Sequence, residues 1–258
     1  MTEFAGRTAL VTGAGRGIGR AIARELAGAG ASLILVARSA SQLADTRDEL
    51  LASGALPGQV HVIPADLADE EQREAATAAA VGTMNVDILI NNAATVEPLG
   101  ATAAVPAADL RHAMELNVVA PFALTAAVLP GMLDSGWGRI VNVSSGIVSR
   151  PATIVGGNVY AATKAALEAH TVNLAAELAG TGVTVNAYRP GGVDTAMQAW
   201  IRDQDPGRIG TALHERFTRS FAEGTLITPE QSATALLAHL ATGETGAVWD
   251  VSTVPARS

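Results

Sequence analysis

Two ionisable side chains, Tyr160 and Lys164, lie four residues apart in the segment YAATK. On a helix, residues at i and i+4 share one face, so the phenol and the ammonium are expected to occupy one small volume. A phenol ionises near pKa ~10 in water, and a neighbouring cation favours its charged form. The spacing therefore predicts an acid–base group whose pKa is lowered toward neutral pH.

A glycine-rich turn, TGAGRGIG, occupies residues 12–19, far upstream of this pair. It follows an apolar segment and opens a helical one. Glycines let the backbone turn sharply and approach a pyrophosphate, which then rests on the helix N-terminus. Tight packing also requires glycine, so the turn by itself favours nucleotide binding without deciding it.

The second predicted strand ends in arginine where an acid is common. NAD sites usually place a carboxylate there to hold the ribose 2′-hydroxyl, but the chain reads Val36-Ala37-Arg38-Ser39. Arg38 and Arg16 could together bind a 2′-phosphate, since a planar guanidinium gives bidentate contacts. We predict NADP(H) in preference to NAD(H); the alternative is that both arginines are merely solvated.

The composition excludes several classes of protein. The chain has 258 residues, 48% of them apolar and 16% charged, which suits a large core. A net charge of −8 does not favour nucleic acid or an anionic membrane surface as a partner. There are no cysteines, and the five histidines lack metal-ligand spacing, so no metal is expected. With neither a signal peptide nor a run of 18 apolar residues, a cytoplasmic protein is expected.

Short β-rich runs alternate with longer alanine-rich stretches, as in repeated βαβ units. The predicted strands are 8–12, 32–37, 60–63, 87–91, 139–143, 183–188 and 247–251. The predicted helices are 17–29, 41–51, 69–80, 107–133, 160–179 and 229–241, with a kink or break at Pro121. We predict one α/β domain over 1–258, with a parallel sheet covered on both faces.

The stretch 196–225 interrupts this alternation with Trp200, Phe217, Phe221 and several arginines. It follows a strand and should emerge at the carboxyl edge of the sheet, where ligands bind in such folds. We predict a substrate lid; the alternative is a pair of surface helices with no gating role.

The chain resembles the short-chain dehydrogenase/reductase family over essentially its full length. Seven short sequence motifs carry the resemblance, and they occur in the order typical of the family: TGAGRGIG at 12–19, Asp66-Leu67, NNAA at 91–94, Asn117 in ELNV, NVSS at 142–145, YAATK at 160–164 and RPGGVDT at 189–195. YxxxK alone occurs often by chance, whereas the ordered set is specific. The resemblance implies a Rossmann-like, doubly wound sheet of seven parallel strands in the order 3-2-1-4-5-6-7.

The resemblance also implies a catalytic set of Asn117, Ser145, Tyr160 and Lys164. Tyr160 would be the general acid, Lys164 would lower its pKa and bind the nicotinamide ribose, and Ser145 would stabilise charge on the substrate oxygen. Asn117 would hold a water that leads protons to Lys164. Ser144 remains an alternative to Ser145, and taken singly each residue could be purely structural.

The residues expected to contact the cofactor come from five of the seven matching motifs and from the end of the second predicted strand. They are Gly13, Gly15, Arg16, Gly17, Ile18, Gly19, Arg38, Ser39, Asp66, Leu67, Asn92, Ala93, Tyr160, Lys164, Pro190, Gly191, Val193 and Thr195.

Two departures from the family pattern stand near the expected site. Ala94 replaces the usual glycine, so the backbone there must accept a Cβ. Fifteen positions separate Ser145 from Tyr160, slightly more than is common. Apolar residues there and at Val193 predict a hydrophobic pocket; they are Ile147, Val148, Ile154, Val155 and Val193.

These features predict an oxidoreductase that transfers a hydride between NADP(H) and a carbonyl or secondary alcohol, with an apolar ketone favoured. A 3-oxoacyl thioester reductase and a non-catalytic NADP(H)-sensing protein are the alternatives. A dehydratase or epimerase fits the glycine spacing less well. Relatives are often tetramers, so a homo-oligomer is expected.

Overall fold

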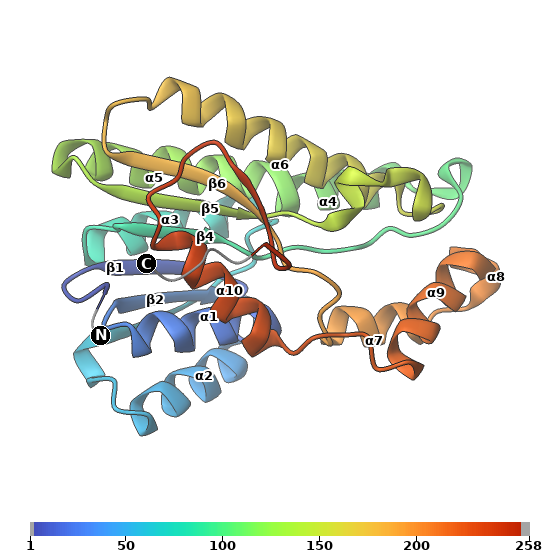
Figure 1. Ribbon diagram of the computed structural model, residues 1–258, viewed down its shortest axis with the longest axis horizontal. Coiled ribbons are helices and arrows are strands. Elements are labelled where there is room, and N and C mark those ends of the chain that lie inside the picture. The colour runs from blue at the N-terminus through green and yellow to red at the C-terminus, as the bar shows by residue number, and fades with distance from the viewer. Residues whose placement is uncertain (1–2, 254–258) are drawn as a thin grey trace.

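A seven-stranded, all-parallel sheet forms the centre of the protein, in the order β3-β2-β1-β4-β5-β6-β7 (Figure 1). The structure is a computed structural model that describes residues 3–253. The strands are β1 (Thr8–Thr12), β2 (Ser32–Ala37), β3 (Val60–Pro64), β4 (Ile88–Asn91), β5 (Gly138–Val143), β6 (Val183–Arg189) and β7 (Val248–Asp250). The strand order and the Rossmann-like class predicted from the sequence are confirmed.

The central strands are buried on both faces, which explains why they are almost wholly apolar. Leu10 on β1 pairs with Ile34 on β2 and with Leu89 on β4, and none of the three is exposed to solvent. Such runs do not alternate because helices cover both sides of a parallel sheet. The sequence pattern therefore determined the sheet type.

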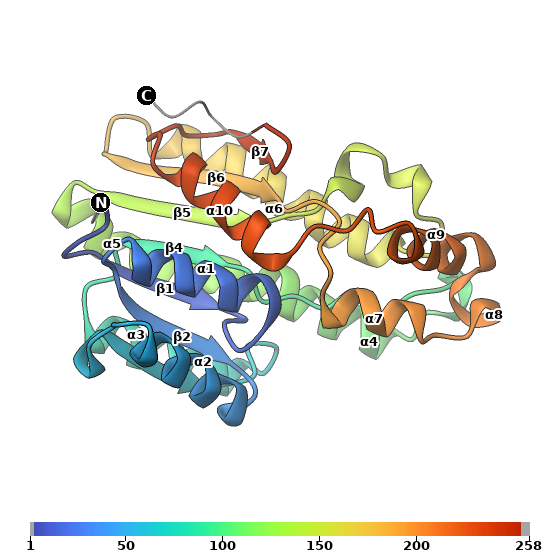
Figure 2. The same ribbon diagram turned by 60° about the horizontal axis from the view of Figure 1, so that its bottom comes forward.

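Two helical layers cover the sheet (Figures 1 and 2). One layer holds α1 (Gly17–Gly28), α2 (Ala40–Ala52) and α10 (Pro229–Leu240), whose apolar faces share one core cluster. The opposite layer holds α3 (Glu70–Thr83), α4 (Ala107–Met114), α5 (Ala120–Ser135) and α6 (Asn158–Glu177). Short 3-10 turns lie at η1 (Pro57–Gln59), η2 (Thr102–Ala104), η4 (Gly146–Ser149) and η5 (Pro151–Thr153).

Local capping explains where α3 and α10 begin. The Asp69 side chain accepts a hydrogen bond from the Gln72 N–H at 2.9 Å. Thr228 and Gln231 form a reciprocal capping box around Pro229, the first residue of α10. Both starts agree with the sequence prediction, because a side-chain oxygen satisfies an N–H that the first turn leaves unpaired.

The break expected at Pro121 is instead a π turn, η3 (Glu115–Val119), between α4 and α5. Proline has no N–H to donate to the Asn117 carbonyl, and the chain widens by one residue before the proline rather than ending the helix. The combined stretch Ala107–Ser135 is the one helix in the described part of the chain long and apolar enough to cross a bilayer, and an 18-residue window of it has a mean hydropathy of 1.8. Its inner face packs into the second core cluster, so composition alone is weak evidence for a membrane span.

Three helices follow β6 and stand apart from the layered body in both views, coloured orange (Figures 1 and 2). They are α7 (Ala196–Arg202), α8 (Pro206–Ile209) and α9 (Thr211–Ala222). Their apolar residues form a third, separate core cluster with the loop after β4. We call this segment, 196–222, the cap segment.

Candidate active site

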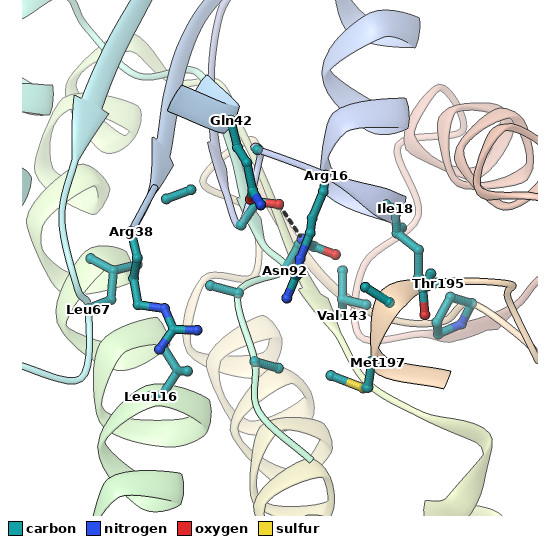
Figure 3. A pocket seen from close by; sticks show the side chains of 18 of the residues that line it. Arg16, Ile18, Arg38, Gln42, Leu67, Asn92, Leu116, Val143, Thr195 and Met197 are labelled. Carbon is teal, nitrogen blue, oxygen red and sulfur yellow. Dashed lines mark hydrogen bonds between the residues drawn. The ribbon is translucent and has the colours of Figure 1, made fainter. Parts of the chain in front are cut away.

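A cavity of about 390 Å³ runs along the carboxyl edge of the sheet. The loop after β1, the end of β2, the loop after β4, the end of β5 and the start of α7 all contribute to its wall (Figure 3). Among the expected cofactor residues, those that line it are Gly13, Gly15, Arg16, Gly17, Ile18, Arg38, Ser39, Leu67, Asn92, Ala93, Tyr160, Lys164, Pro190 and Thr195.

The glycines after β1 are required by close backbone approach. Gly13 has φ +65°, a left-handed conformation that favours glycine. A Cβ on Gly19 would lie 2.2 Å from the Gly13 carbonyl oxygen and 2.6 Å from Asn92 Nδ2. Gly19 thus allows the two ends of the turn to approach each other closely, and it does not line the cavity itself. The turn forms a glycine cradle at the N-terminus of α1, which suits a pyrophosphate.

Asn92 holds this turn against the end of β4. Its Nδ2 donates to the Thr12 carbonyl at 2.9 Å, and its backbone N–H donates to Thr12 Oγ1 at 2.9 Å. Asn91 points into the protein and donates to Asn142 Oδ1 at 2.9 Å. The two adjacent amides therefore differ: Asn92 borders the cavity, whereas Asn91 joins two strands.

Arg16 and Arg38 border the same end of the cavity, from the loop after β1 and from the end of β2 (Figure 3). Both are exposed, and Gln42 of α2, which also lines this cavity, lies against Gly15 of the turn. No Asp or Glu occurs among the described residues that line this cavity. The rim therefore offers cationic donors and no carboxylate, which suits an anionic group such as a phosphate.

Asp66 lies outside the cavity, contrary to its expected adenine contact. Its Oδ1 accepts a hydrogen bond from the Ala68 N–H at 3.0 Å, so the carboxylate caps the turn before α3. The neighbouring residues Ala65 and Leu67 line the wall instead. An aspartate at a strand end satisfies local N–H groups readily, and sequence alone could not separate the two roles.

Tyr160 and Lys164 lie on one face of α6, as their spacing predicts, but burial shifts the pKa of Tyr160 upward, opposite to the expectation. The ammonium is almost fully buried and donates to the Val143 carbonyl at 2.7 Å, with Nζ 5.8 Å from the centre of the Tyr160 ring. Burial raises the pKa of Tyr160 to about 12, and the Ser145 side chain opposes this only in part. Burial lowers the pKa of Lys164 to about 8. Desolvation outweighs the attraction that spacing alone suggested.

Two consecutive serines at the end of β5 have different partners. Ser144 Oγ donates to Glu168 Oε1 at 2.7 Å, and Arg189 binds that carboxylate through Nε at 2.8 Å and Nη2 at 2.7 Å. Ser145 lines a neighbouring apolar cavity together with Tyr160. Because the Ser144 hydroxyl is engaged by Glu168, the geometry favours Ser145 as the serine that faces a substrate.

Asn117 is fully buried in the π turn and lines neither cavity. Its Oδ1 accepts from the Thr95 N–H and its Nδ2 donates to the Thr95 carbonyl, both at 2.8 Å. Nδ2 also lies 3.1 Å from Thr163 Oγ1 on α6. The side chain therefore pins the loop after β4 to the helix that carries Tyr160. Any water would have to be held by its main-chain carbonyl, which has no N–H partner from Pro121.

A second cavity, of about 120 Å³, adjoins the first beneath the cap segment. Of the pocket residues expected from the sequence, Ile154 and Val193 line it, whereas Ile147 and Val148 do not and Val155 is 75% exposed. Gly191 also lies here and not in the first cavity. Much of the apolar wall comes from the segment predicted as a lid, through Met197, Ile201, Leu213 and Phe217, and from Val96 and Leu99, which the sequence reasoning missed. The i, i+4 spacing on α7 and α9 was the available signal for the first four.

Six residues line both cavities: Ile18, Ser144, Tyr160, Pro190, Thr195 and Met197. Tyr160 is the one titratable side chain among them. A phenol in this position can exchange a proton with a group in the apolar cavity while facing a cofactor in the other. The part of the chain that the structure describes holds no cluster of His, Asp or Glu able to bind a metal ion.

Two ketoacyl reductases are among the known proteins with related sequences. Ketoacyl reductase HetN of Nostoc sp. is 38% identical over 212 residues, covering 81% of this chain and 72% of that protein. The 3-oxoacyl-[acyl-carrier-protein] reductase FabG of Aquifex aeolicus is 32% identical, covering 97% of each chain.

Two solved structures match closely. A putative NAD(P)-dependent gluconate 5-dehydrogenase from Beutenbergia cavernae, with bound NADP, has a TM-score of 0.83 at 33% identity and covers 97% of this chain and 96% of its own. Actinorhodin polyketide ketoreductase with NADPH also has a TM-score of 0.83, at 32% identity and 96% coverage of each chain. Residues 7–206 match the short chain dehydrogenase family. The chain therefore belongs to the short-chain dehydrogenase/reductase family and is an oxidoreductase.

Proposed function

We propose that this protein is an NADP(H)-dependent carbonyl reductase or alcohol dehydrogenase that acts on a small or medium apolar ketone. The observation that carries the proposal is the position of Tyr160 in the wall between a glycine-lined cavity and an apolar one. A broad panel of ketones, followed by loss of NADPH absorbance, tests it. Tight NADPH binding with no turnover of any ketone would favour the alternative, a non-catalytic sensing protein.

The cofactor cavity fits a dinucleotide phosphate on features of this chain. The glycine turn would hold the pyrophosphate, Arg16 and Arg38 the 2′-phosphate, and Lys164 a ribose hydroxyl. When bound, NADP(H) supplies or accepts the hydride. NADP(H) in two of the matching structures supports this choice, although a 3-ketoacyl-(acyl-carrier-protein) reductase from Brucella melitensis was solved with NADH.

In the reductive direction, Tyr160 donates its proton to the substrate carbonyl oxygen. Its raised pKa keeps the phenol protonated throughout the neutral range, which is the form a general acid needs. Ser145 donates a hydrogen bond to the same oxygen and stabilises the charge that develops on it. Lys164, when protonated, stabilises the phenolate that Tyr160 leaves behind.

The reduction rate is expected to fall as pH rises through about 8, because Lys164 loses its charge there. Below this pH the ammonium is present and supports the developing phenolate. Lys164→Met should lower kcat and remove this inflection from the pH profile. A profile that keeps the same inflection in the variant would show that another group titrates.

The cap segment is proposed to close over the substrate. Its tip lies against two glycines: a Cβ on Gly156 would be 2.8 Å from the Ile209 carbonyl, and one on Gly100 would be 2.8 Å from the Arg208 carbonyl. Arg216 of α9 also donates to the Thr153 carbonyl at 3.0 Å. These contacts join the cap to both loops that flank the apolar cavity.

Gly156→Ala is expected to raise KM for the ketone several-fold and to leave KM for NADPH unchanged, because the added methyl displaces the cap tip. Steady-state kinetics with each substrate varied measures this. Gly210→Ala is the matched control, since Gly210 has a similar φ of +96° but no atom within 4 Å of its Cβ. Equal effects from both variants would attribute the change to backbone strain alone.

A 3-oxoacyl thioester is the second candidate substrate, supported by the ketoacyl reductases among the relatives. The narrow apolar cavity favours a compact ketone instead. Comparing kcat/KM for acetoacetyl thioesters with that for cyclic ketones distinguishes the two. The cytoplasmic location expected from the sequence stays a prediction.

We also expect a homo-oligomer, formed through exposed apolar side chains on α4, α5 and α6. Phe122 on α5 is 43% exposed and its ring centre lies 3.6 Å from that of His170 on α6, where Val172 is also 51% exposed. Sedimentation equilibrium should give a mass above that of one chain, and Phe122→Lys should lower it. Val155→Lys, at an exposed site away from these helices, is the control; a monomeric wild type contradicts the expectation.

A further inference from the structure

The apolar cavity contains one polar side chain to which the proposed reaction gives no role. Five side chains with hydrogen-bonding groups line it: Ser144, Ser145, Tyr160, Thr195 and Gln198. Ser144 is bound to Glu168, and Ser145 and Tyr160 face the reacting carbonyl. Thr195 Oγ1 caps α7 by accepting the Gln198 N–H at 3.5 Å. Of these five polar groups, only the carboxamide of Gln198 is left without an assigned role.

The oxygen atom of this carboxamide is buried and has no hydrogen-bond donor. Gln198 Oε1 is inaccessible to solvent and accepts no hydrogen bond. An unsatisfied buried acceptor costs roughly 1–3 kcal/mol, so such atoms are uncommon without a function. The terminal torsion of glutamine is broad, and the amide plane can turn toward the cavity at little cost.

Arg202 lies one turn further along α7, on the same helical face as Gln198. Its Nη1 is also buried without a hydrogen-bond partner. The guanidinium is held elsewhere, however, with its carbon 4.0 Å from the centre of the Phe221 ring and Nη2 3.9 Å from Asp194 Oδ1. Arg202 does not line the cavity. A donor that enters the cavity reaches Gln198 without competing for the stacked arginine.

We propose that Gln198 is a specificity-determining residue that accepts a hydrogen bond from a hydroxyl group on the substrate. The inference rests on the proposed function and narrows its substrate class to hydroxy ketones, and the corresponding diols in the oxidative direction. The apolar wall binds the carbon skeleton, Tyr160 and Ser145 bind the carbonyl, and Gln198 recognises the second oxygen. A site built to pair a hydroxyl discriminates against an analogue without it, because its own polar atom is then left unpaired.

The test measures binding, so that it does not depend on turnover. NADPH-loaded enzyme carrying Tyr160→Phe is titrated calorimetrically with 3- and 4-hydroxycyclohexanone and with 3- and 4-methylcyclohexanone, which have similar shapes. At one position at least, the hydroxy ketone should bind more tightly than the methyl ketone. Adding Gln198→Met should reduce the ratio of the hydroxy-ketone affinity to the methyl-ketone affinity about tenfold or more. The variant loses the hydrogen bond to the hydroxyl group, and it no longer leaves an unpaired acceptor when the methyl ketone binds.

Gln204→Met is the matched control, since Gln204 lies in the same segment but outside the cavity. Its Nε2 donates to the Trp200 carbonyl at 3.0 Å and its Oε1 accepts from Arg208 at 3.3 Å. This variant should keep the wild-type ratio. Gln198→Glu, which retains an acceptor, should preserve the preference for hydroxy ketones.

The inference is overturned if the hydroxy ketones bind no better than the methyl ketones, or if Gln198→Met leaves the ratio unchanged at both positions. Failure of the proposed function has a different signature: the protein with Tyr160 intact would bind NADPH but turn over no ketone. The binding ratios in the Tyr160→Phe background decide the role of Gln198 in either case.

Discussion

Replacing Tyr160 by phenylalanine is expected to lower kcat for ketone reduction by ~10²–10⁴-fold, the usual contribution of a general acid. Tyr160 is the one titratable side chain shared by the two cavities, and burial keeps it protonated with a pKa of about 12. Phenylalanine preserves the ring and removes only the acidic hydroxyl. The affinity for NADPH, measured by fluorescence titration, should therefore change little.

The only other tyrosine provides the control for this experiment. Tyr188 is fully buried in β6 and donates to the Ser232 carbonyl at 2.7 Å, and it lines neither of these cavities. Tyr188→Phe should lower the melting temperature while turnover per folded molecule stays near that of the wild type. Substantial residual activity in Tyr160→Phe, at unchanged NADPH affinity, would exclude Tyr160 as the proton donor.

Replacing both Arg16 and Arg38 by alanine should raise KM for NADPH by about 100-fold or more and change KM for NADH much less. Each guanidinium can make charge-assisted hydrogen bonds to a 2′-phosphate, worth roughly 1.5–3 kcal/mol apiece. NADH has no 2′-phosphate, so its binding should depend little on these two arginines. The ratio of kcat/KM for the two cofactors is the quantity to measure.

Arg47→Ala is the matched control for this pair. Arg47 lies on α2, is paired with Asp48 at 3.0 Å and does not line the cofactor cavity. It should leave the cofactor ratio unaltered, although the net charge changes equally for each arginine removed. If the double variant lowers kcat/KM for NADH as much as for NADPH, the two arginines do not select the cofactor. Their effect would then come from the overall charge of the protein or from the conformation of the glycine turn.

The sequence pattern alone determined the parallel sheet and most helix boundaries, and the family resemblance supplied the strand order. Buried strands of a parallel sheet require uninterrupted apolar runs, and caps such as Asp69 and Thr228 act on the N–H groups within three residues of them. The glycine turn and the Tyr160–Lys164 spacing are equally local. The i, i+4 rule placed both side chains on one helical face before any tertiary contact was known.

Only the tertiary structure decided what surrounds those groups. Burial raises the pKa of Tyr160, against the expectation from spacing, and lowers that of Lys164, because desolvation depends on every neighbouring element. Tertiary packing also engaged Ser144 with Glu168, 24 residues further along the chain. The contribution of Val96 and Leu99 to the apolar wall also depended on folding, because the loop that carries them meets Phe217 only in the tertiary structure.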